Sequence, residues 1–244
     1  MAQSVNPAGV EHIFAFNSDD RVSAYHPEVS AGVAGERLPG RVTAVRNWNA
    51  AAERSSGNLL FVIADDLLPP PDWDQQLLTI IRDLDPIRTP FVVKVLDSEV
   101  FGDSLIRHPV VSRCYFQRFG LFYSGYEGLV ADVDFTLDAH RRGMVVDGRS
   151  LALDHRHPSR GAGASASHVL MENAAARRIG EELLAQRWPL WKRHLRRSYF
   201  PMRAGQASVG SVQMAWRGLG SRIGYVGGLL RAPARGAAKA VLRR

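Results

Sequence analysis

The sequence has little cysteine and no long hydrophobic run. Its single cysteine, Cys114, excludes an internal disulfide framework and a zinc site built from cysteines. No stretch approaches the ~18 uncharged apolar residues of a membrane-spanning helix, and the N-terminal residues show no hydrophobic secretion signal. A content of 45% hydrophobic residues excludes a disordered chain. We therefore expect a globular, cytoplasmic protein.

Several motifs of nucleotide-binding proteins and hydrolases are also missing. The chain has no G-x-x-x-x-G-K-[ST] phosphate loop and no G-x-G-x-x-G directly after an apolar strand. It lacks the G-x-S-x-G nucleophile elbow and the H-E-x-x-H metalloprotease motif. The corresponding enzyme classes do not fit this chain.

Acidic residues are absent from the last quarter of the chain, and this divides its charge. Residues 1–182 hold all 24 acidic residues and 18 of the 31 basic ones, a net charge of −6. Residues 183–244 hold the other 13 basic residues, so the total is +7. A nucleic-acid-binding domain would carry its basic charge throughout, and nucleic acid is therefore an unlikely partner. The division indicates a mildly acidic catalytic or binding core with a basic extension.

Apolar runs alternate with segments of helical character along the first part of the chain. The expected extended segments are His12–Phe16, Leu59–Ile63, Phe91–Leu96, Val145–Val146 and Leu151–Leu153. The expected helices are Val42–Glu53, Trp73–Leu84 with Asp72 as its cap, Ser112–Phe119, Val133–Arg142 and a helix within 172–200 that Pro189 breaks or kinks. This alternation predicts an α/β fold with an open, mostly parallel sheet flanked by helices.

Polar residues follow three of the extended segments. They are the pairs Asp19/Asp20, Asp65/Asp66 and His155/His157. Ligands of open α/β sheets bind beyond the C-terminal ends of the strands, where these pairs stand. Two carboxylates on one loop can hold a hard divalent cation that neutralises a diphosphate. For an isolated Asp-Asp pair the favoured interpretation is a solvated acidic turn that caps the helix at Trp73, because such pairs are common.

The order of several short motifs carries more information than any one of them. The stretches are Arg46–Ala50, Leu59–Trp73, Val111–Phe122, Ala131–Leu137 and Leu151–His157. Together they resemble the GT-A glycosyltransferases, specifically the family 2-like inverting enzymes, over about residues 10–158. That family's pattern runs Arg-Asn, an apolar strand with Asp-x-Asp, Pro-Pro-x-Trp, Glu-Asp-x-Asp-Leu and a final strand bearing His.

The resemblance implies a sugar transfer from a nucleotide-diphosphate-sugar donor to a glycan, lipid or small-molecule acceptor, with inversion and with Mn²⁺ or Mg²⁺. Asp66 matches the metal-binding Asp of the Asp-x-Asp motif, and Asp65 matches its middle residue. His155 or His157 matches the late metal ligand. The two histidines alternate along an extended segment and face opposite sides, so at most one points at the metal, and His155 is preferred.

The resemblance also implies a base and a nucleotide pocket. Asp132 matches the general base that deprotonates the acceptor hydroxyl. Asp19 or Asp20 matches the acid that contacts the nucleoside, and Arg46 and Asn47 lie near the nucleotide. Each residue has a plainer interpretation. Asp132 or Asp134 can cap a helix, Arg46 can be an ordinary surface cation, and Asn47 can be a hydrogen-bonding residue inside a helix.

The chain departs from the family pattern in three ways. Ala64 replaces the first Asp of the metal motif, and Ala131 replaces the Glu before the expected base. The chain starts at what resembles the family's second strand, so we expect the usual first βα unit to be absent, replaced by a partner, or lost from a wrongly placed start. These departures leave a second interpretation open, a non-catalytic GT-A-like binding protein or an adaptor.

We expect three regions: a catalytic core over 1–158, a flexible loop with C-terminal helices over 159–200, and a basic tail over 201–244. Apolar residues in the tail recur at three- and four-residue steps from Val209 to Leu230, with Arg217 and Arg222 between them. Such a basic amphipathic helix suits an anionic membrane surface, at the inner face of the membrane. A helix that docks on the core or forms a homo-oligomer is an equal alternative.

Overall fold

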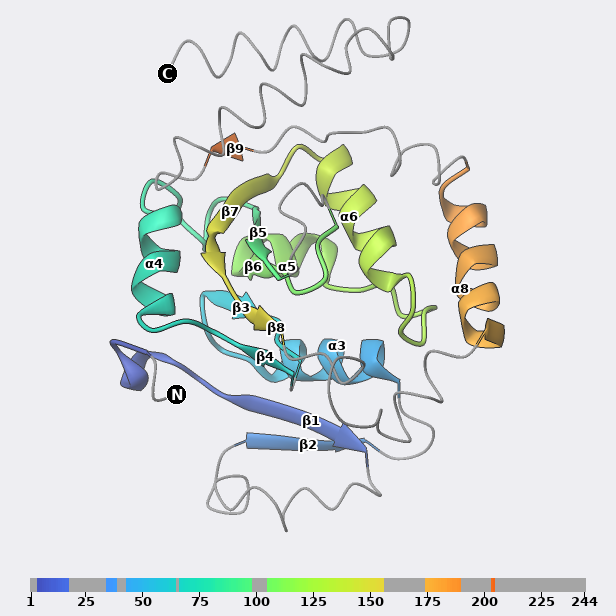
Figure 1. Cartoon of the computed structure of the whole chain (residues 1–244), viewed down its shortest axis with the longest axis horizontal. Helices are drawn as coiled ribbons and strands as arrows, with labels where there is room; N and C mark the ends of the chain where they lie inside the picture. Colours follow the sequence, from blue (N-terminus) through green and yellow to red (C-terminus); the bar gives the residue numbers. More distant parts are fainter. Residues whose placement is uncertain are drawn as a thin grey trace, which may run out of the picture.

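The centre of the molecule is a five-stranded sheet flanked by helices (Figure 1), in a computed structural model that describes residues 4–17, 34–38, 43–64, 66–97, 105–155, 174–189 and 203–204. Its strands, in spatial order, are β3 (Leu59–Phe61), β6 (Val110–Ser112), β5 (Val92–Leu96), β7 (Val145–Ala152) and β9 (Arg203–Ala204). Strand β6 is antiparallel to both of its neighbours, while β5, β7 and β9 are parallel. The predicted α/β class is confirmed, but the sheet is mixed, because two of the four pairings between its described strands are antiparallel.

Five α-helices are described, after a short 3₁₀ helix at Pro7–Gly9. They are α3 (Ala44–Arg54), α4 (Trp73–Ile80), α5 (Arg113–Phe119), α6 (Ala131–Arg141) and α8 (Ala174–Arg187). Side-chain caps begin two of them: the Thr43 hydroxyl accepts the backbone N–H of Arg46, and the Ser112 hydroxyl accepts that of Tyr115. Helix α8 ends before Pro189, because proline has no backbone N–H with which to continue the helical hydrogen bonds.

Both faces of the sheet are buried, because successive side chains of a strand point in opposite directions. Val92 and Val145 face one core, which includes residues of α3, α5, α6 and α8. Val93 and Val146 face a second core together with α4. Burial on both sides explains why two valines stand next to each other in each strand, Val92–Val93 in β5 and Val145–Val146 in β7.

Two small sheets complete the fold. Strand β1 (Ile13–Asn17) pairs in parallel with β2 (Ala34–Leu38), next to α3 (Figure 1). Strand β4 (Leu67–Leu68) pairs antiparallel with β8 (Asp154–His155). The second pairing joins segments distant in the sequence at the ends of β3 and β7.

Some predicted boundaries are wrong. Helix α4 ends at Ile80 instead of Leu84. Asp72 occupies its N-cap position as predicted, with a left-handed backbone (φ 58°), but its side chain makes no cap hydrogen bond. Helix α6 starts at Ala131 with Val130 at its N-cap, so the proposed Asp132 or Asp134 cap is wrong as well. The two short pieces at 145–153 form one strand with an irregularity in its pairing to β5.

No helix in the part of the chain that the structure describes is long and apolar enough to span a membrane. Of the predicted tail, the structure describes Arg203–Ala204, which pair with Val146–Asp147 at the edge of the sheet. The apolar stripe from Val209 to Leu230 lies outside the described residues.

Candidate functional site

The short β4–β8 pairing brings Asp66 against His155. Leu67 is the register partner of His155, so the residue before Leu67 lies beside the histidine ring. Oδ2 of Asp66 is 3.2 Å from Nε2 of His155. The other carboxylate oxygen, Oδ1, is buried and has no hydrogen-bond partner among the described residues. A buried oxygen without a donor is costly, and a ligand atom would relieve that cost.

The hydrogen-bond partner of Nδ1 in His155 indicates which ring nitrogen carries the proton. Nδ1 lies 3.1 Å from the backbone carbonyl oxygen of Asp97. A carbonyl oxygen only accepts hydrogen bonds, so Nδ1 carries the hydrogen. In the neutral ring Nε2 then holds a lone pair directed at the Asp66 carboxylate. Two acceptors at this distance repel each other unless a second ring proton or a cation lies between them.

Asp97 itself is a buried charge that the sequence analysis did not identify. Its side chain is 1% exposed, and Oδ1 lies 3.6 Å from both Lys94 Nζ and Arg107 Nη1. Burial acts to raise the pKa of Asp97, but the His108 hydrogen bond and the nearby cations outweigh it and lower the pKa to about 2. Asp97 is therefore an ionised carboxylate in the interior. In the sequence, a single acidic residue after an apolar strand cannot be distinguished from an ordinary loop residue.

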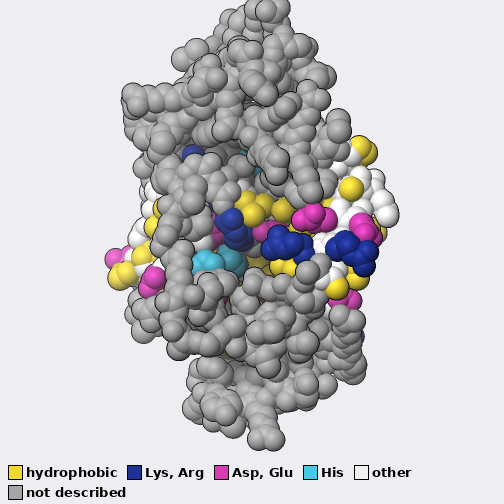
Figure 2. All heavy atoms as spheres, turned by 45° about the vertical axis from the view of Figure 1, so that its right-hand side comes forward, with side chains coloured by type: hydrophobic (Ala, Val, Ile, Leu, Met, Phe, Trp, Pro, Cys, Tyr) yellow, Lys and Arg dark blue, Asp and Glu magenta, His cyan; other side chains and the backbone are white. Residues whose placement is uncertain are grey.

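Asp132 lies in the first turn of α6, near the same cluster. Its Oδ1 accepts the backbone N–H of Val133 at 2.9 Å. Burial raises the pKa of Asp132, and the positive charges of Arg107 and His108 oppose that shift. Figure 2 shows histidine, basic and acidic side chains gathered over the middle of one face. A carboxylate with a raised pKa suits proton transfer near neutral pH.

The remaining predicted residues are less informative. Arg46 is exposed on α3, and Asn47 is half-buried beside it, with its Oδ1 buried and without a hydrogen-bond partner among the described residues. Asp19, Asp20, Asp65 and His157 lie outside the described residues. Within the described ranges, no group of three or more His, Cys, Asp or Glu side chains could hold a metal ion. Asp66 and His155 therefore form a two-residue set there.

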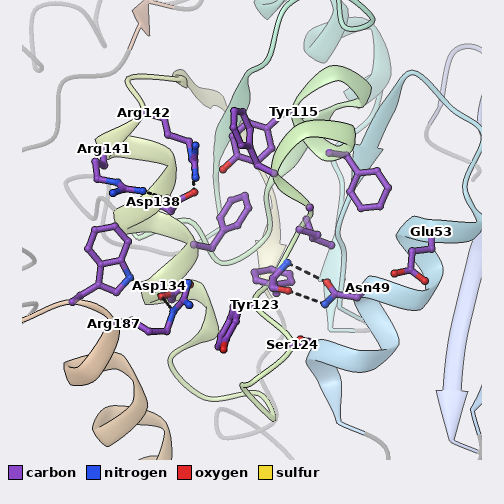
Figure 3. A pocket seen from close by; sticks show the side chains of 17 residues that line it. Asn49, Glu53, Tyr115, Tyr123, Ser124, Asp134, Asp138, Arg141, Arg142 and Arg187 are labelled. Atoms are coloured by element: carbon purple, nitrogen blue, oxygen red, sulfur yellow. Dashed lines mark hydrogen bonds and ion pairs between the residues drawn. The ribbon is translucent and has the colours of Figure 1, made fainter.

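A separate cavity of about 620 Å³ lies between α3, α5, α6 and α8 (Figure 3). Three arginines line it, and each stacks on an aromatic ring and pairs with an acid of α6. The stacked pairs are Arg141 on Trp188, Arg142 on Phe119 and Arg187 on Tyr123. The acids are Asp138 for Arg141 and Arg142, and Asp134 for Arg187. Each arginine therefore already has an acid partner, and the Arg187–Asp134 pair connects α8 to α6 across the cavity.

Comparisons of the chain with protein-family models, with curated proteins and with solved structures find no match.

Proposed function

We propose that the chain is a GT-A-like, metal-dependent inverting glycosyltransferase that uses a nucleotide-diphosphate-sugar donor. The observation that carries the proposal is the contact between Asp66 and His155, 3.2 Å apart although 89 residues separate them in the sequence. Both residues lie where an α/β sheet binds its ligands, and both match the metal positions of the GT-A pattern.

The chemistry of this pair fits a hard divalent cation. A carboxylate oxygen and an imidazole nitrogen are both suitable ligands for Mn²⁺. The buried Oδ1 of Asp66 accepts no hydrogen bond from the described residues, so it can bind an ion. Mg²⁺ and related ions are often bound by one or two protein ligands and completed by substrate phosphates. Asp66 and His155 would hold the ion, which when bound would neutralise the charge of the diphosphate leaving group.

Asp132 would take the proton of the acceptor hydroxyl. In a single displacement, the acceptor oxygen bonds to the anomeric carbon as the bond from that carbon to the diphosphate oxygen breaks. The hydroxyl proton passes to the Asp132 carboxylate, and the leaving diphosphate takes the electron pair of the broken bond. The raised pKa of Asp132 supports this role, because a more basic carboxylate accepts a proton more readily.

Calorimetry with Mn²⁺ and nucleoside diphosphates tests the proposal. The wild-type protein should bind a nucleoside diphosphate with Mn²⁺ and lose most of that affinity when a chelator is added. Asp66→Asn and His155→Gln should each reproduce the loss, whereas Asp83→Asn, an exposed carboxylate on the surface, should not. Equal binding with and without metal would contradict the metal role. Metal-dependent binding without turnover of any nucleotide sugar would favour a non-catalytic binding protein.

A further inference from the structure

A second histidine, His108, is anchored in the same way as His155. Its backbone N–H donates to Oδ2 of Asp97 at 3.1 Å, and its ring Nδ1 lies 3.2 Å from the same oxygen. Because Oδ2 of Asp97 acts as the hydrogen-bond acceptor for both groups, Nδ1 of His108 carries the hydrogen. His108 is buried and contacts Asp97 at two points, one on its backbone and one on its ring, so Asp97 sets the orientation of the ring.

Both histidines therefore depend on one residue. Asp97 holds His108 through its carboxylate and His155 through its backbone carbonyl, in each case through Nδ1. The two rings meet edge to face, with centroids 6.0 Å apart and planes at 84°. In each ring Nε2 is the nitrogen directed away from Asp97, and that of His155 faces Oδ2 of Asp66.

We propose that Asp97 is the positioning residue of the site, and that the His108 it orients contacts a sugar hydroxyl of the donor. This inference rests on the function proposed above. Asp97 does not act on the substrate itself. It sets the orientation of His108, which does. The position of Asp97 supports the positioning role, because Asp97 directly follows the central strand β5 and its side chain is buried.

The chemistry of Nε2 selects the kind of group that His108 would bind. With its Nδ1–H committed to Asp97, the ring presents Nε2 to a ligand, and in the singly protonated ring this nitrogen accepts a hydrogen bond. Phosphate oxygens are also acceptors and do not complement it, whereas a hydroxyl donates. None of the described residues donates to Nε2 of His108, which leaves it available to a ligand. A polyhydroxylated sugar fits better than the diphosphate.

Nitrogen-15 NMR of histidine side chains tests the positioning role without metal or nucleotide. In the wild-type protein, His108 and His155 should both show the tautomer with hydrogen on Nδ1. Asp97→Ala should abolish that preference for His108 and leave it for His155, whose partner is a main-chain oxygen. Asp97→Asn, which keeps an acceptor oxygen, should preserve the preference for His108. A wild-type His108 with its hydrogen on Nε2 would overturn the proposal.

Asp147→Asn is the matched control for loss of a buried charge. Asp147 is also buried on a strand of the same sheet, where it pairs with Arg149 at 2.7 Å. This variant should lower the melting temperature as an Asp97 variant does but leave both histidine spectra unchanged. If Asp147→Asn alters His108 as much as Asp97→Ala does, Asp97 has a general structural role and the proposal fails.

A binding experiment tests the ligand contact. With Mn²⁺, His108→Ala should weaken binding of UDP-glucose or GDP-mannose, whichever the wild-type protein binds, by about two- to tenfold, the effect of one hydrogen bond. Binding of UDP or GDP alone should be unchanged. Equal losses for the nucleotide sugar and the nucleoside diphosphate would exclude the sugar contact. If the wild-type protein binds no nucleotide, the proposed function and the sugar contact both fail, while the NMR result still decides the role of Asp97.

Discussion

Trp188 donates its indole Nε1–H to Oδ1 of Asp134 at 2.6 Å, which ties the end of helix α8 to helix α6. Arg187 donates to the same oxygen at 2.8 Å, and the Tyr126 hydroxyl contacts it at 3.4 Å. Asp134 is 3% exposed, so its charge is stabilised mainly by these donors. Its role is to dock α8, on the side of α6 lined by the arginine–aromatic cavity.

Asp134→Ala should therefore destabilise the protein strongly. We expect a loss of about 2–4 kcal/mol in the free energy of unfolding, because the charge-assisted bond disappears and the Trp188 donor is left without its partner. Urea denaturation measures the change. Asp138→Ala is the control one turn further along α6, where the ion pairs are more exposed and the loss should stay below about 1 kcal/mol. Equal losses would contradict the docking role.

Gly180→Ala should also weaken the contact of α8. A Cβ at this position would lie 2.7 Å from Val130 Cγ2 and 2.9 Å from the Leu129 carbonyl oxygen. Alanine favours a helix by about 1 kcal/mol, but a backbone oxygen cannot easily move away, so we expect a net loss of about 1–3 kcal/mol. Thermal denaturation compares it with Gln186→Ala, an exposed change on the same helix that should stay within about 0.5 kcal/mol. A stabilising Gly180→Ala would show that α8 can shift outwards freely.

Asp132→Asn tests the base. Donor binding should persist while turnover falls by about two to four orders of magnitude, the usual contribution of a general base. Asp138→Asn on the same helix should keep full turnover. A small effect on rate together with a clear loss of stability would show that Asp132 acts mainly on the first turn of α6.

The contact between Asp74 and the N-terminal segment should depend on pH. Burial acts to raise the pKa of Asp74, but hydrogen bonds from the Ser4 hydroxyl (2.6 Å) and the Val5 and Asn6 amides (3.0 and 2.9 Å) lower it well below its usual range. The contribution to stability is therefore complete above the unfolded pKa of about 4 and is lost as the pH falls through the lower folded value.

Amide chemical shifts of Val5 and Asn6 would follow this change. They should stay constant from pH 7 to about 4 and change only below it, because Asp74 is still ionised in the folded protein there. In Asp74→Asn they should show no such transition. A midpoint at or above the ordinary pKa of aspartic acid would contradict the bonding described.

Membrane association of the basic tail stays a prediction. Full-length protein should bind anionic vesicles, bind more weakly as salt rises and gain helical signal on binding. Arg217→Glu with Arg222→Glu should weaken that binding without changing the melting temperature of the core. If vesicles have no effect, and a chain ending after Ala204 loses a dimer that the full chain forms, the tail is an oligomerisation surface. Retaining Ala204 keeps strand β9 in the sheet.

Local features of the fold could be predicted because they depend on neighbouring residues. The apolar runs at Leu59–Phe61 and Val92–Leu96 are strands, and Ser112 begins a helix, as their sequences indicate. The short strand β6 was missed, because three residues carry too little periodicity to distinguish a strand from a turn. Its pairing between β3 and β5 is a tertiary contact.

The α/β class, the concentration of basic charge after Glu182 and the candidate pairs Asp65/Asp66 and His155/His157 can be read from the chain alone. Three contacts could be found only in the folded protein: Asp66 with His155, Asp134 with α8, and Asp97 with two histidines. Hydrophobic periodicity and capping act over a few residues. The energy of a buried charge depends instead on partners that distant segments bring to it, and no local pattern records which segments those will be.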